Sequence, residues 1–400
     1  MAESDILIIG AGPAGQALAV ALADAGFSVC MVEASPAGQL AQPAYDGREI
    51  ALTHLSADIL KRLGIWQLFP AMAVGRIRRA RVFNGRSRYS MDLDASRTGR
   101  ECLGFMLSNQ HIRRACFQRV SNSSGIELIT GIRVERVEAT ARGGAVFLES
   151  GRVLRARLVV AADSRFSTAR RQMGISTRMV DFGRTCIVCT MRVEGDHRQE
   201  AWECFHEDRT LAVLPLERGR VSIVITLPAE QAGSVMAMAP EALAEDVARR
   251  IRYALGNLLL EGERHAYPLV ATLADRFYKP GFVLVGAAAV GMHPVTAHGY
   301  NLGLQGAWNL ACQLSAEKAK AGDWSAEAVL RRWSRQHMQY AAPIWYGTNL
   351  VVGLFNDNRP LARLLRAGAL RLGNHCPPLQ GFILDRLMEL PSGHGLALRP

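Results

Sequence analysis

A glycine-rich turn near the start of the chain constrains the fold more than any other feature. An apolar run over residues 5–9 leads directly into Gly10-Ala11-Gly12-Pro13-Ala14-Gly15, and residues 14–26 are rich in alanine. This order predicts a short buried strand, a tight turn and a helix. A second strand is expected over residues 27–32, and Glu33 follows it. The segment is therefore predicted to form one β-α-β unit.

The spacing of the three glycines fits a dinucleotide-binding cradle. Gly10 would make the turn, Gly12 would let the backbone approach a pyrophosphate, and Gly15 would let the helix pack closely on the strand. The helix N-terminus offers free N–H groups and the positive end of its dipole to the phosphates. Glu33 stands where an acid accepts hydrogen bonds from a ribose, which favours FAD or NAD over a 2′-phosphorylated nucleotide.

The composition limits the class of protein. The chain has 400 residues, of which 49% are hydrophobic and 21% are charged, and this excludes a disordered chain, a coiled coil and a collagen-like fibre. At about 100–200 residues per domain, two or three domains are expected. Eight cysteines exclude a disulfide scaffold. The first residues carry no basic stretch, so we expect no signal peptide and a cytoplasmic location.

Two patterns bear on metals and membranes. Cys186 and Cys189 form a CxxC motif, but on a strand these positions face opposite sides of the sheet, and no second pair stands at zinc spacing. We therefore predict no metal site. The most apolar run, residues 283–292, has 10 residues. A membrane-spanning helix needs about 20 apolar residues, so none is expected.

The positive charge of the chain leaves its partner open. Lys and Arg number 47 against 36 Asp and Glu, and the resulting net charge of +11 indicates an anionic ligand or surface. Residues 76–119 hold 11 arginines and 3 acids, yet they match no nucleic-acid-binding module, and we predict no nucleic acid partner. This stretch is either a solvated strand face or a region that attracts the phosphates of NADH or NADPH.

The C-terminal part of the chain is expected to be helical and basic. Leucines recur at helical spacing over residues 361–372, and residues 359–375 contain four arginines and no acid. Such a helix would either lie on anionic lipid or pack on the dinucleotide-binding domain.

Two later segments follow the cradle in a recognisable order. Residues 158–170 contain Asp163 after an apolar strand, and residues 283–303 contain Gly286-Ala287, His293-Pro294 and His298-Gly299. Together with the cradle they resemble the flavin-dependent aromatic hydroxylases, the class A monooxygenases. Residues 46–56, 103–114 and 355–365 resemble segments of the ubiquinone-biosynthesis hydroxylases, above all those of the 5-demethoxyubiquinol hydroxylase type.

The resemblance implies an α/β fold. It consists of a Rossmann-like FAD-binding domain with an inserted mixed-sheet substrate domain and a helical C-terminal segment. The FAD-binding domain would use residues 1–75, 100–175 and 275–340. The substrate domain would use residues 76–99 and 176–274, and the C-terminal segment residues 341–400. Residues 201–205 and 211–216 would form the floor of the substrate pocket, unless Trp202 and Phe205 are ordinary core residues.

The resemblance also implies an activity. NADH or NADPH would reduce FAD, and the reduced flavin would form a C4a-hydroperoxide with O₂ that hydroxylates the aromatic ring of a polyprenylated ubiquinone precursor. Two alternatives stay open: a flavin hydroxylase of a soluble phenol or quinolone, and a non-catalytic flavin-binding subunit of a quinone-biosynthesis assembly. A polyprenylated substrate would place the protein peripherally on the inner membrane, with other quinone-biosynthesis proteins as partners.

The FAD-binding residues implied by the resemblance come from the cradle and from later positions. They are Gly10, Ala11, Gly12, Pro13, Ala14, Gly15, Glu33, Arg48, Asn109, Val134, Asp163, Gly286, Ala287, Gly299, Asn301, Leu302 and Gly303. His293 and Pro294 are the implied catalytic residues, and His54 and His298 are further candidate bases unless they are structural. The family usually has Gly at the position of Ser164 and Asp or Asn at that of Ala287, so we expect weakened FAD binding.

Overall fold

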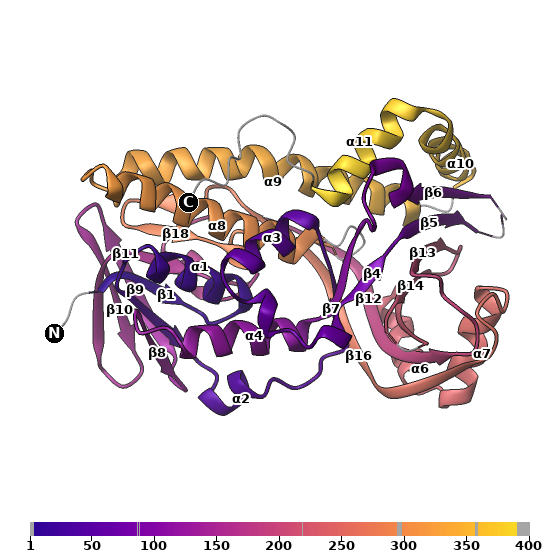
Figure 1. Cartoon of the computed structure of the whole chain (residues 1–400), viewed down its shortest axis with the longest axis horizontal. Coiled ribbons are helices and arrows are strands. Elements are labelled where there is room, and N and C mark those ends of the chain that lie inside the picture. The colour runs from indigo at the N-terminus through magenta and orange to yellow at the C-terminus, as the bar shows by residue number, and fades with distance from the viewer. Residues whose placement is uncertain are drawn as a thin grey trace.

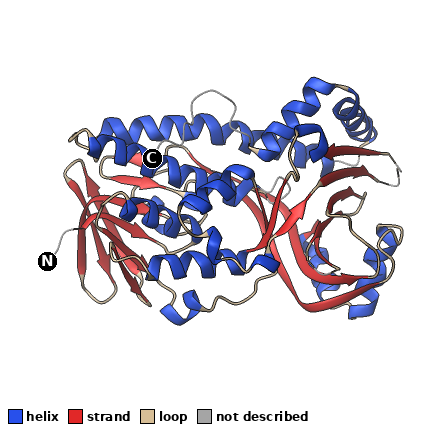
Figure 2. Cartoon of the chain, viewed as in Figure 1, coloured by secondary structure: helices blue, strands red, loops and turns tan. Residues whose placement is uncertain are grey.

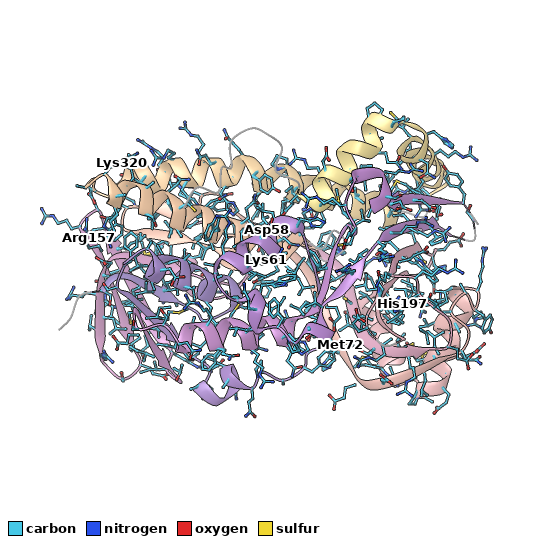
Figure 3. The ribbon with its side chains drawn as sticks, viewed as in Figure 1. Asp58, Lys61, Met72, Arg157, His197 and Lys320 are labelled. Atoms are coloured by element: carbon cyan, nitrogen blue, oxygen red, sulfur yellow. The ribbon has the colours of Figure 1, made fainter. Side chains whose placement is uncertain are left out.

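The computed structural model describes residues 4–389 except 86, 88, 218, 294–297, 357 and 358. The described residues form two eight-stranded sheets and a three-stranded sheet between them (Figures 1 and 2). Figure 3 shows Arg157 and Lys320 at the end of the molecule formed by the first sheet, and His197 in the part built on the second.

The first sheet has a parallel centre. Its order is β17 (Tyr278–Lys279), β18 (Phe282–Leu284), β11 (Val153–Ala161), β1 (Ser4–Ile9), β2 (Val29–Glu33) and β8 (Ile126–Thr130). The pairs from β18 to β8 are parallel, and β9 (Val134–Thr140) and β10 (Gly143–Leu148) add an antiparallel hairpin to β11. Residues 6–9 of β1 are fully or nearly fully buried, as expected of a parallel strand covered on both faces.

Helices follow the first sheet's strands as the β-α-β pattern predicts. The α1 helix (Pro13–Asp24) begins with a proline at its first position, where the missing N–H costs no hydrogen bond. It packs against α4 (Asn109–Ser121) and α8 (His298–Ala319). Smaller helices are α2 (Ala37–Ala41), α3 (His54–Arg62) and α5 (Thr168–Gln172). The predicted α/β class and the strand–turn–helix–strand order at the N-terminus are confirmed.

The second sheet is mixed and strongly elongated. Its order is β19 (Val290–Gly291), β16 (Leu258–Ala274), β12 (Thr177–Val193), β15 (Arg220–Pro228), β14 (Thr210–Pro215), β13 (Glu200–Phe205), β5 (Arg79–Asn84) and β6 (Ser90–Asp94). The β13–β5 pair is parallel and the other pairs are antiparallel. The helices α6 (Ala232–Met236) and α7 (Pro240–Arg250) cover one face with a separate apolar core.

Short elements connect the two large sheets. The strands β3 (Glu49–Leu52), β7 (Gly104–Ser108) and β4 (Gly75–Ile77) form the three-stranded sheet. Short 3₁₀ turns are η1 (Trp66–Leu68), η2 (Ala71–Ala73), η3 (Ala95–Thr98), η4 (Ala229–Gln231) and η5 (Gly286–Ala288). The strand β19 comes from the stretch that we assigned to the FAD-binding domain, yet it pairs with β16 of the second sheet.

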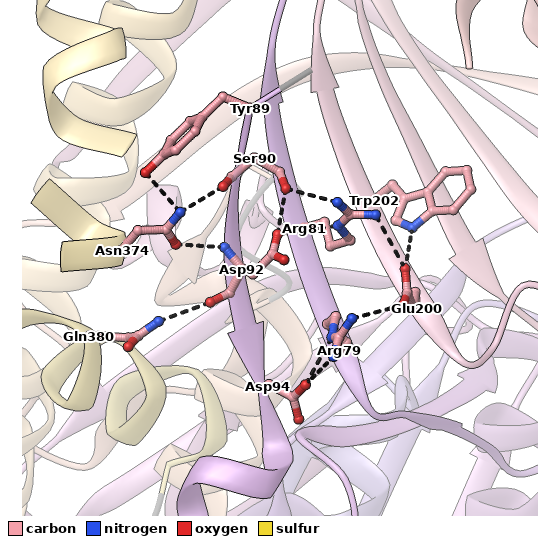
Figure 4. A network of polar contacts seen from close by, with 10 residues as sticks. All are labelled: Arg79, Arg81, Tyr89, Ser90, Asp92, Asp94, Glu200, Trp202, Asn374 and Gln380. Atoms are coloured by element: carbon pink, nitrogen blue, oxygen red, sulfur yellow. Dashed lines mark hydrogen bonds and ion pairs between the residues drawn. The ribbon is translucent and has the colours of Figure 1, made fainter. Parts of the chain in front are cut away.

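The C-terminal helices are α9 (Glu327–Asn356), α10 (Pro360–His375) and α11 (Pro377–Met388). In Figure 1, α9 runs along the first sheet's helices, and α10 and α11 lie over β5 and β6. Asn374 accepts a hydrogen bond from the Asp92 N–H at 2.9 Å, and Gln380 donates to the Asp92 carbonyl at 2.9 Å (Figure 4). Phe355 and Leu370 pack on Phe205. The described part of α10 therefore docks on the second sheet, rather than on the dinucleotide-binding strands.

The placement of the CxxC motif can be compared with its prediction. Cys186 and Cys189 lie in different apolar clusters, on opposite faces of β12, as predicted. No group of three or more His, Cys, Asp or Glu side chains among the described residues is placed to hold a metal ion. Of the helices in the described ranges, none combines the length and the apolar character that crossing a membrane requires.

Candidate active site

The glycines of the N-terminal turn have different steric roles. Gly10 has a φ of +98°, and a Cβ there would lie 2.7 Å from the Ala162 carbonyl oxygen. A Cβ on Gly15 would lie 2.6 Å from the Gly10 carbonyl oxygen. At Gly12 the nearest atom to such a Cβ is 4.0 Å away, so space is open there. Gly12 is also the N-cap of α1 and provides no side-chain cap, which leaves N–H groups of the first turn for a ligand.

Glu33 lies at the end of β2, directly beside this turn. One carboxylate oxygen accepts a hydrogen bond from the Ala11 N–H at 2.7 Å, and the other accepts one from the Ser35 N–H at 2.8 Å. The segment that leads to Val134 passes alongside, because the Ile132 N–H donates to the Glu33 carbonyl at 3.2 Å. The structure therefore brings the turn, Glu33 and the start of β9 together.

A second glycine contact places η5 against the same helix. Gly286 has a φ of +59°, and a Cβ there would lie 3.1 Å from the Ala14 Cβ. A Cβ on Gly303 would lie 3.1 Å from the Gly286 Cα. The first turn of α1, η5 and the start of α8 are thus packed together through Ala14, Gly286 and Gly303. Ala287 is exposed, although residues 286, 288 and 289 around it are buried.

Asp163 lies next to the glycine turn and has an uncommitted oxygen. Its Oδ2 accepts a hydrogen bond from the Thr168 N–H at 3.1 Å, while its buried Oδ1 has no hydrogen-bond partner within the described ranges. Its Cα would lie 2.7 Å from a Cβ on Gly10. A buried acceptor without a partner beside an open helix N-terminus fits a site that a polar ligand completes.

Arg170 is a site residue that the sequence analysis missed. It is 3% exposed, and its guanidinium donates to the Ala288 carbonyl at 2.7 Å and to the Arg165 carbonyl at 3.0 Å. Arg170 therefore fixes η5 to the segment that contains Asp163. Arg170 is the last residue of the 158–170 segment, but its partners are two backbone carbonyls that the sequence does not identify.

Arg48 and Asn109 meet on a carboxylate that the sequence analysis also missed. Asp46 accepts hydrogen bonds from the Arg48 guanidinium at 2.6 Å and from the Asn109 amide at 2.8 Å. Burial alone would raise the pKa of Asp46, but the hydrogen bonds and charge of Arg48 and the Asn109 bond outweigh it, and the pKa is lowered. The Arg48 guanidinium carbon lies 5.5 Å from the centre of the Tyr267 ring of the second sheet. This cluster therefore lies where the two sheets face each other.

The start of α8 contains the remaining predicted FAD-binding residues. Leu302 and Gly303 are buried and Gly299 is exposed. The Asn301 amide accepts from the Thr53 N–H at 3.1 Å and donates to the Ala51 carbonyl at 2.8 Å, so it ties α8 to the end of β3. Pro294, predicted to be catalytic, and residues 295–297 lie outside the described residues.

The three candidate histidines differ in their surroundings. Burial, together with the charge of Arg184, lowers the pKa of His293 to about 4, and its ring centre lies 4.8 Å from that of Phe182. A neutral imidazole results at pH 7, which hydrogen-bonds well but retains a proton poorly. His54 contacts the Cys102 carbonyl at 2.8 Å and His298 the Arg386 carbonyl at 3.4 Å, as expected of structural histidines.

The predicted pocket floor divides between the two faces of the second sheet. Trp202 packs in the core beneath α6 and α7, so it lies on the face away from the first sheet. Phe205 packs on Phe355 with ring centres 4.0 Å apart. The sequence analysis placed Trp202 and Phe205 together, either in the floor of the substrate pocket or in the core. Strand alternation instead puts them on opposite faces of the sheet.

The basic stretch over residues 76–119 contributes to a separate cavity. This cavity has a volume of about 650 Å³, and five arginines and three acids line it. Arg79 pairs with Asp94 at 2.6 Å and with Glu200 at 3.4 Å (Figure 4). The ion pairs favour a solvated strand face for Arg79, whereas Arg78 and Arg100 form no ion pair with another described residue. Attraction of NADH or NADPH phosphates by the stretch stays a prediction.

An open helix N-terminus and an acid at the end of β2 are the features of a dinucleotide-binding site, and the relatives of the chain show that it is an FAD-dependent monooxygenase. The family described as "FAD binding domain" matches residues 3–337. Ubiquinone hydroxylase UbiM of Neisseria meningitidis is 44% identical over 389 residues, which cover 96% of this chain and 84% of that protein. Ubiquinone hydroxylase UbiL of Rhodospirillum rubrum is 33% identical and covers 96% and 89%. The chain belongs to this FAD-binding family of aromatic monooxygenases.

Solved structures share the fold at lower identity. PqsL of Pseudomonas aeruginosa, described as a probable FAD-dependent monooxygenase, superposes with a TM-score of 0.78 at 21% identity and covers 92% of this chain and 99% of that one. p-Nitrophenol 4-monooxygenase PnpA of Pseudomonas putida gives a TM-score of 0.78 at 16% identity and covers 96% and 98%. The predicted fold, with an α/β FAD-binding part and a helical C-terminus, is confirmed.

Proposed function

We propose that this protein hydroxylates the aromatic ring of a polyprenylated ubiquinone precursor. The observation that carries the proposal is the 44% identity, over nearly the whole chain, to a protein named a ubiquinone hydroxylase. The E. coli 3-demethoxyubiquinol 3-hydroxylase, 29% identical over 91% of this chain, supports the same substrate class. The relatives favour this hydroxylase over the soluble-phenol and non-catalytic alternatives that the sequence left open.

We propose that FAD lies along the first turn of α1 and continues toward the second sheet. The N–H groups after Gly12 would bind the pyrophosphate, and Glu33 would accept the ribose hydroxyls beside the Val134 backbone. The buried Asp163 Oδ1, which has no hydrogen-bond partner among the described residues, would make a further polar contact. The remaining proposed contacts come from the Arg48–Asn109 cluster, from Gly286 and Ala287, and from Gly299 to Gly303.

FAD, reduced by NADH or NADPH, would supply the activation of O₂ and the transfer of one oxygen atom to the ring. The chain supplies the geometry of the site and the exclusion of water. The apolar second-sheet face around Cys186, Val188 and Leu269 would exclude water from the substrate. His293 would act as a hydrogen-bonding group and not as a proton carrier, because its low pKa keeps the imidazole neutral.

Quinone profiles of bacterial strains test the proposed function. Each strain lacks one ring hydroxylase and expresses this protein, and mass spectrometry measures its ubiquinone and precursors. We expect ubiquinone to be restored in at least one strain, and that strain identifies the ring carbon. The Gly12→Val variant should not restore it. Absence of ubiquinone in every strain, with soluble FAD-loaded protein present, would contradict the proposal.

We also propose that the C-terminal helices bring the protein to an anionic membrane surface, where a polyprenylated substrate resides. Leu350, Val351, Leu365 and Leu372 are 75%, 41%, 53% and 57% exposed on α9 and α10. Exposed leucines next to arginines are typical of helices that lie in the headgroup region. Deleting residues 350–400 would remove Phe355 and Leu370 from the core on Phe205, so point variants give a cleaner test.

The test replaces Leu350, Leu365 and Leu372 with glutamate together. We expect sedimentation with phosphatidylglycerol vesicles to fall at least about tenfold, because three apolar side chains are lost and three negative charges repel the lipid. The matched control is Leu259→Glu, whose side chain is 54% exposed on β16 of the second sheet. Equal sedimentation of the triple variant and the control would contradict a membrane role for these helices.

A further inference from the structure

Glu203 occupies an unusual position on β13 of the second sheet. Its neighbours Trp202 and Cys204 point into the core beneath α6 and α7. Side chains alternate along a strand, so Glu203 points to the opposite face, as do Ala201 and Phe205. Ala201 packs in a cluster with Leu384 of α11, and Phe205 packs against Phe355 of α9. The C-terminal helices therefore cover this face on either side of Glu203.

The surroundings of Glu203 are apolar. Directly across the strands lie Val82 on β5 and Ala212 on β14. The next residues on the same face, Ala201 and Phe205, belong to two different apolar clusters, and neither cluster includes Glu203. A carboxyl group thus lies where four apolar side chains meet.

Within the described ranges, Glu203 has no polar partner. No hydrogen bond or ion pair joins its carboxyl group to another residue that the structure describes. Burial raises the pKa of the Cys186 and Cys204 thiols, and the nearby Glu203 raises both pKa values further. Burial raises the pKa of Glu203 itself to about 8. The Glu203 side chain is only partly buried, so its carboxyl group is a polar group on an apolar face that a ligand can reach.

The face that holds Glu203 continues to the candidate flavin site. Register pairs lead across the sheet from Glu203 through Ala212 and Val224 to Val188 and then to His265. Val188 and His265 both lie 2.7 Å from where a Cβ on Gly47 would be, and Gly47 stands between Asp46 and Arg48. One continuous sheet face therefore connects Glu203 with the Arg48–Asn109 cluster.

We propose that Glu203 recognises the substrate, as a neutral carboxyl group that hydrogen-bonds to an oxygen substituent of its aromatic ring. This inference rests on the proposed function, because it assigns a residue to the ring that is hydroxylated. A neutral carboxyl group carries one O–H donor and acceptor oxygens, so it can pair with a ring hydroxyl in either direction. The apolar residues around it suit the ring itself, and a pocket with few polar groups is typical of small-molecule sites.

The neutral form distinguishes this role from that of a base. At neutral pH a carboxyl group with this pKa is mostly protonated. Glutamine reproduces the shape and the donor–acceptor pair of a neutral carboxyl group, but it cannot accept a proton from a phenol. Leucine has a similar size and neither function. The two substitutions at Glu203 therefore separate recognition, proton transfer and simple packing.

The test uses the FAD-loaded full-length protein and a short-chain prenylated phenol as the probe. We expect Glu203→Gln to change KM and kcat by less than about threefold, and Glu203→Leu to raise KM at least about tenfold. Without the probe, Glu203→Leu should not lower the melting temperature, because the substitution removes no hydrogen bond or ion pair to another described residue. Glu263→Gln on β16 is the matched control, since Glu263 is exposed and lies outside the proposed site.

Three outcomes would overturn the proposal. A loss of kcat in Glu203→Gln as large as in Glu203→Leu would show a proton-transfer role. An unchanged KM in Glu203→Leu would show that the ring does not contact Glu203. A lower melting temperature of Glu203→Leu would show a structural role for the carboxyl group. Binding of the probe without NADH, followed by the flavin absorbance, tests recognition even if the wild-type protein fails to hydroxylate it, so failure of the proposed function is seen separately.

Discussion

Replacing Gly12 with valine is expected to abolish FAD binding while the protein still folds. Gly12 caps α1 at the point where N–H groups are free, and a Cβ there has no neighbour closer than 4.0 Å. A valine side chain would therefore occupy open space without a clash in the protein, and that space is the one proposed for the pyrophosphate. We expect the FAD affinity to fall at least about 100-fold, which corresponds to about 2.7 kcal/mol.

Gly15→Val is the matched variant, because it should lower the folding stability directly, whereas Gly12→Val should lower FAD binding. Its Cβ would lie 2.6 Å from the Gly10 carbonyl oxygen, a backbone atom that cannot move away cheaply. Overpacking of this kind costs about 1–3 kcal/mol of folding stability. Flavin absorbance after purification measures the cofactor content, and thermal unfolding with and without added FAD measures stability. If Gly12→Val unfolds at the same lowered temperature as Gly15→Val, its loss of FAD would be a folding defect and the cradle argument would be wrong.

The parts of the fold that the sequence predicts well are local. The strand, turn and helix at residues 4–24 follow from a short apolar run, a glycine pattern and an alanine-rich stretch, all within one β-α-β unit. Glu33 is recognised because it stands at a fixed distance from Gly15 in that unit. Residue spacing alone therefore determines which side chains meet around the turn.

The parts that the sequence could not predict depend on contacts between distant segments. Asp46 accepts hydrogen bonds from Arg48 and Asn109, but only the packing of α4 beside the 46–49 segment brings Asn109 there. Arg170 bonds the Ala288 carbonyl, 118 residues away. Trp202 and Phe205 are three residues apart, so strand alternation alone places them on opposite faces, but the helices that cover each face come from distant segments. The apolar neighbours of Glu203, Val82 and Ala212, are known only from the strand register.

The α10 helix shows the same limit of prediction from sequence: the pattern gives the element but not its contacts. Its leucine and arginine pattern predicted an amphipathic helix, and α10 confirms the helix. The pattern could not identify the surface that the helix covers. Arg366 is 3% exposed and donates to the Phe355 carbonyl at 2.7 Å, so one arginine of the basic series is buried in protein, while Leu365 and Leu372 are exposed. Protein contacts and lipid contacts were thus both compatible with one sequence pattern.

Replacing Ala287 with aspartate is expected to tighten FAD binding by about 10- to 100-fold. Ala287 is exposed within η5, and the residues on either side of it are buried, so a longer side chain has room there. The resemblance to the flavin-dependent aromatic hydroxylases implies Asp or Asn at this position, and a hydrogen bond to a charged group is worth about 1.5–3 kcal/mol. The new carboxylate would accept a hydrogen bond from the part of FAD that lies between α1 and α8, because Ala14 and Gly303 contact Gly286 on either side.

Two further substitutions show whether the gain comes from the acceptor. Ala287→Asn offers a neutral acceptor and should give a smaller gain, and Ala287→Leu offers none and should give no gain. Equilibrium dialysis with the apoprotein gives the three affinities, and thermal unfolding of the apoprotein shows whether the substitutions change the fold itself. An aspartate variant that binds FAD no better than the wild type would mean that this chain holds its cofactor through other contacts, with the free Asp163 oxygen as the next to substitute. A tighter variant with unchanged turnover would show that the alanine limits cofactor retention and leaves the chemistry of the ring unaffected.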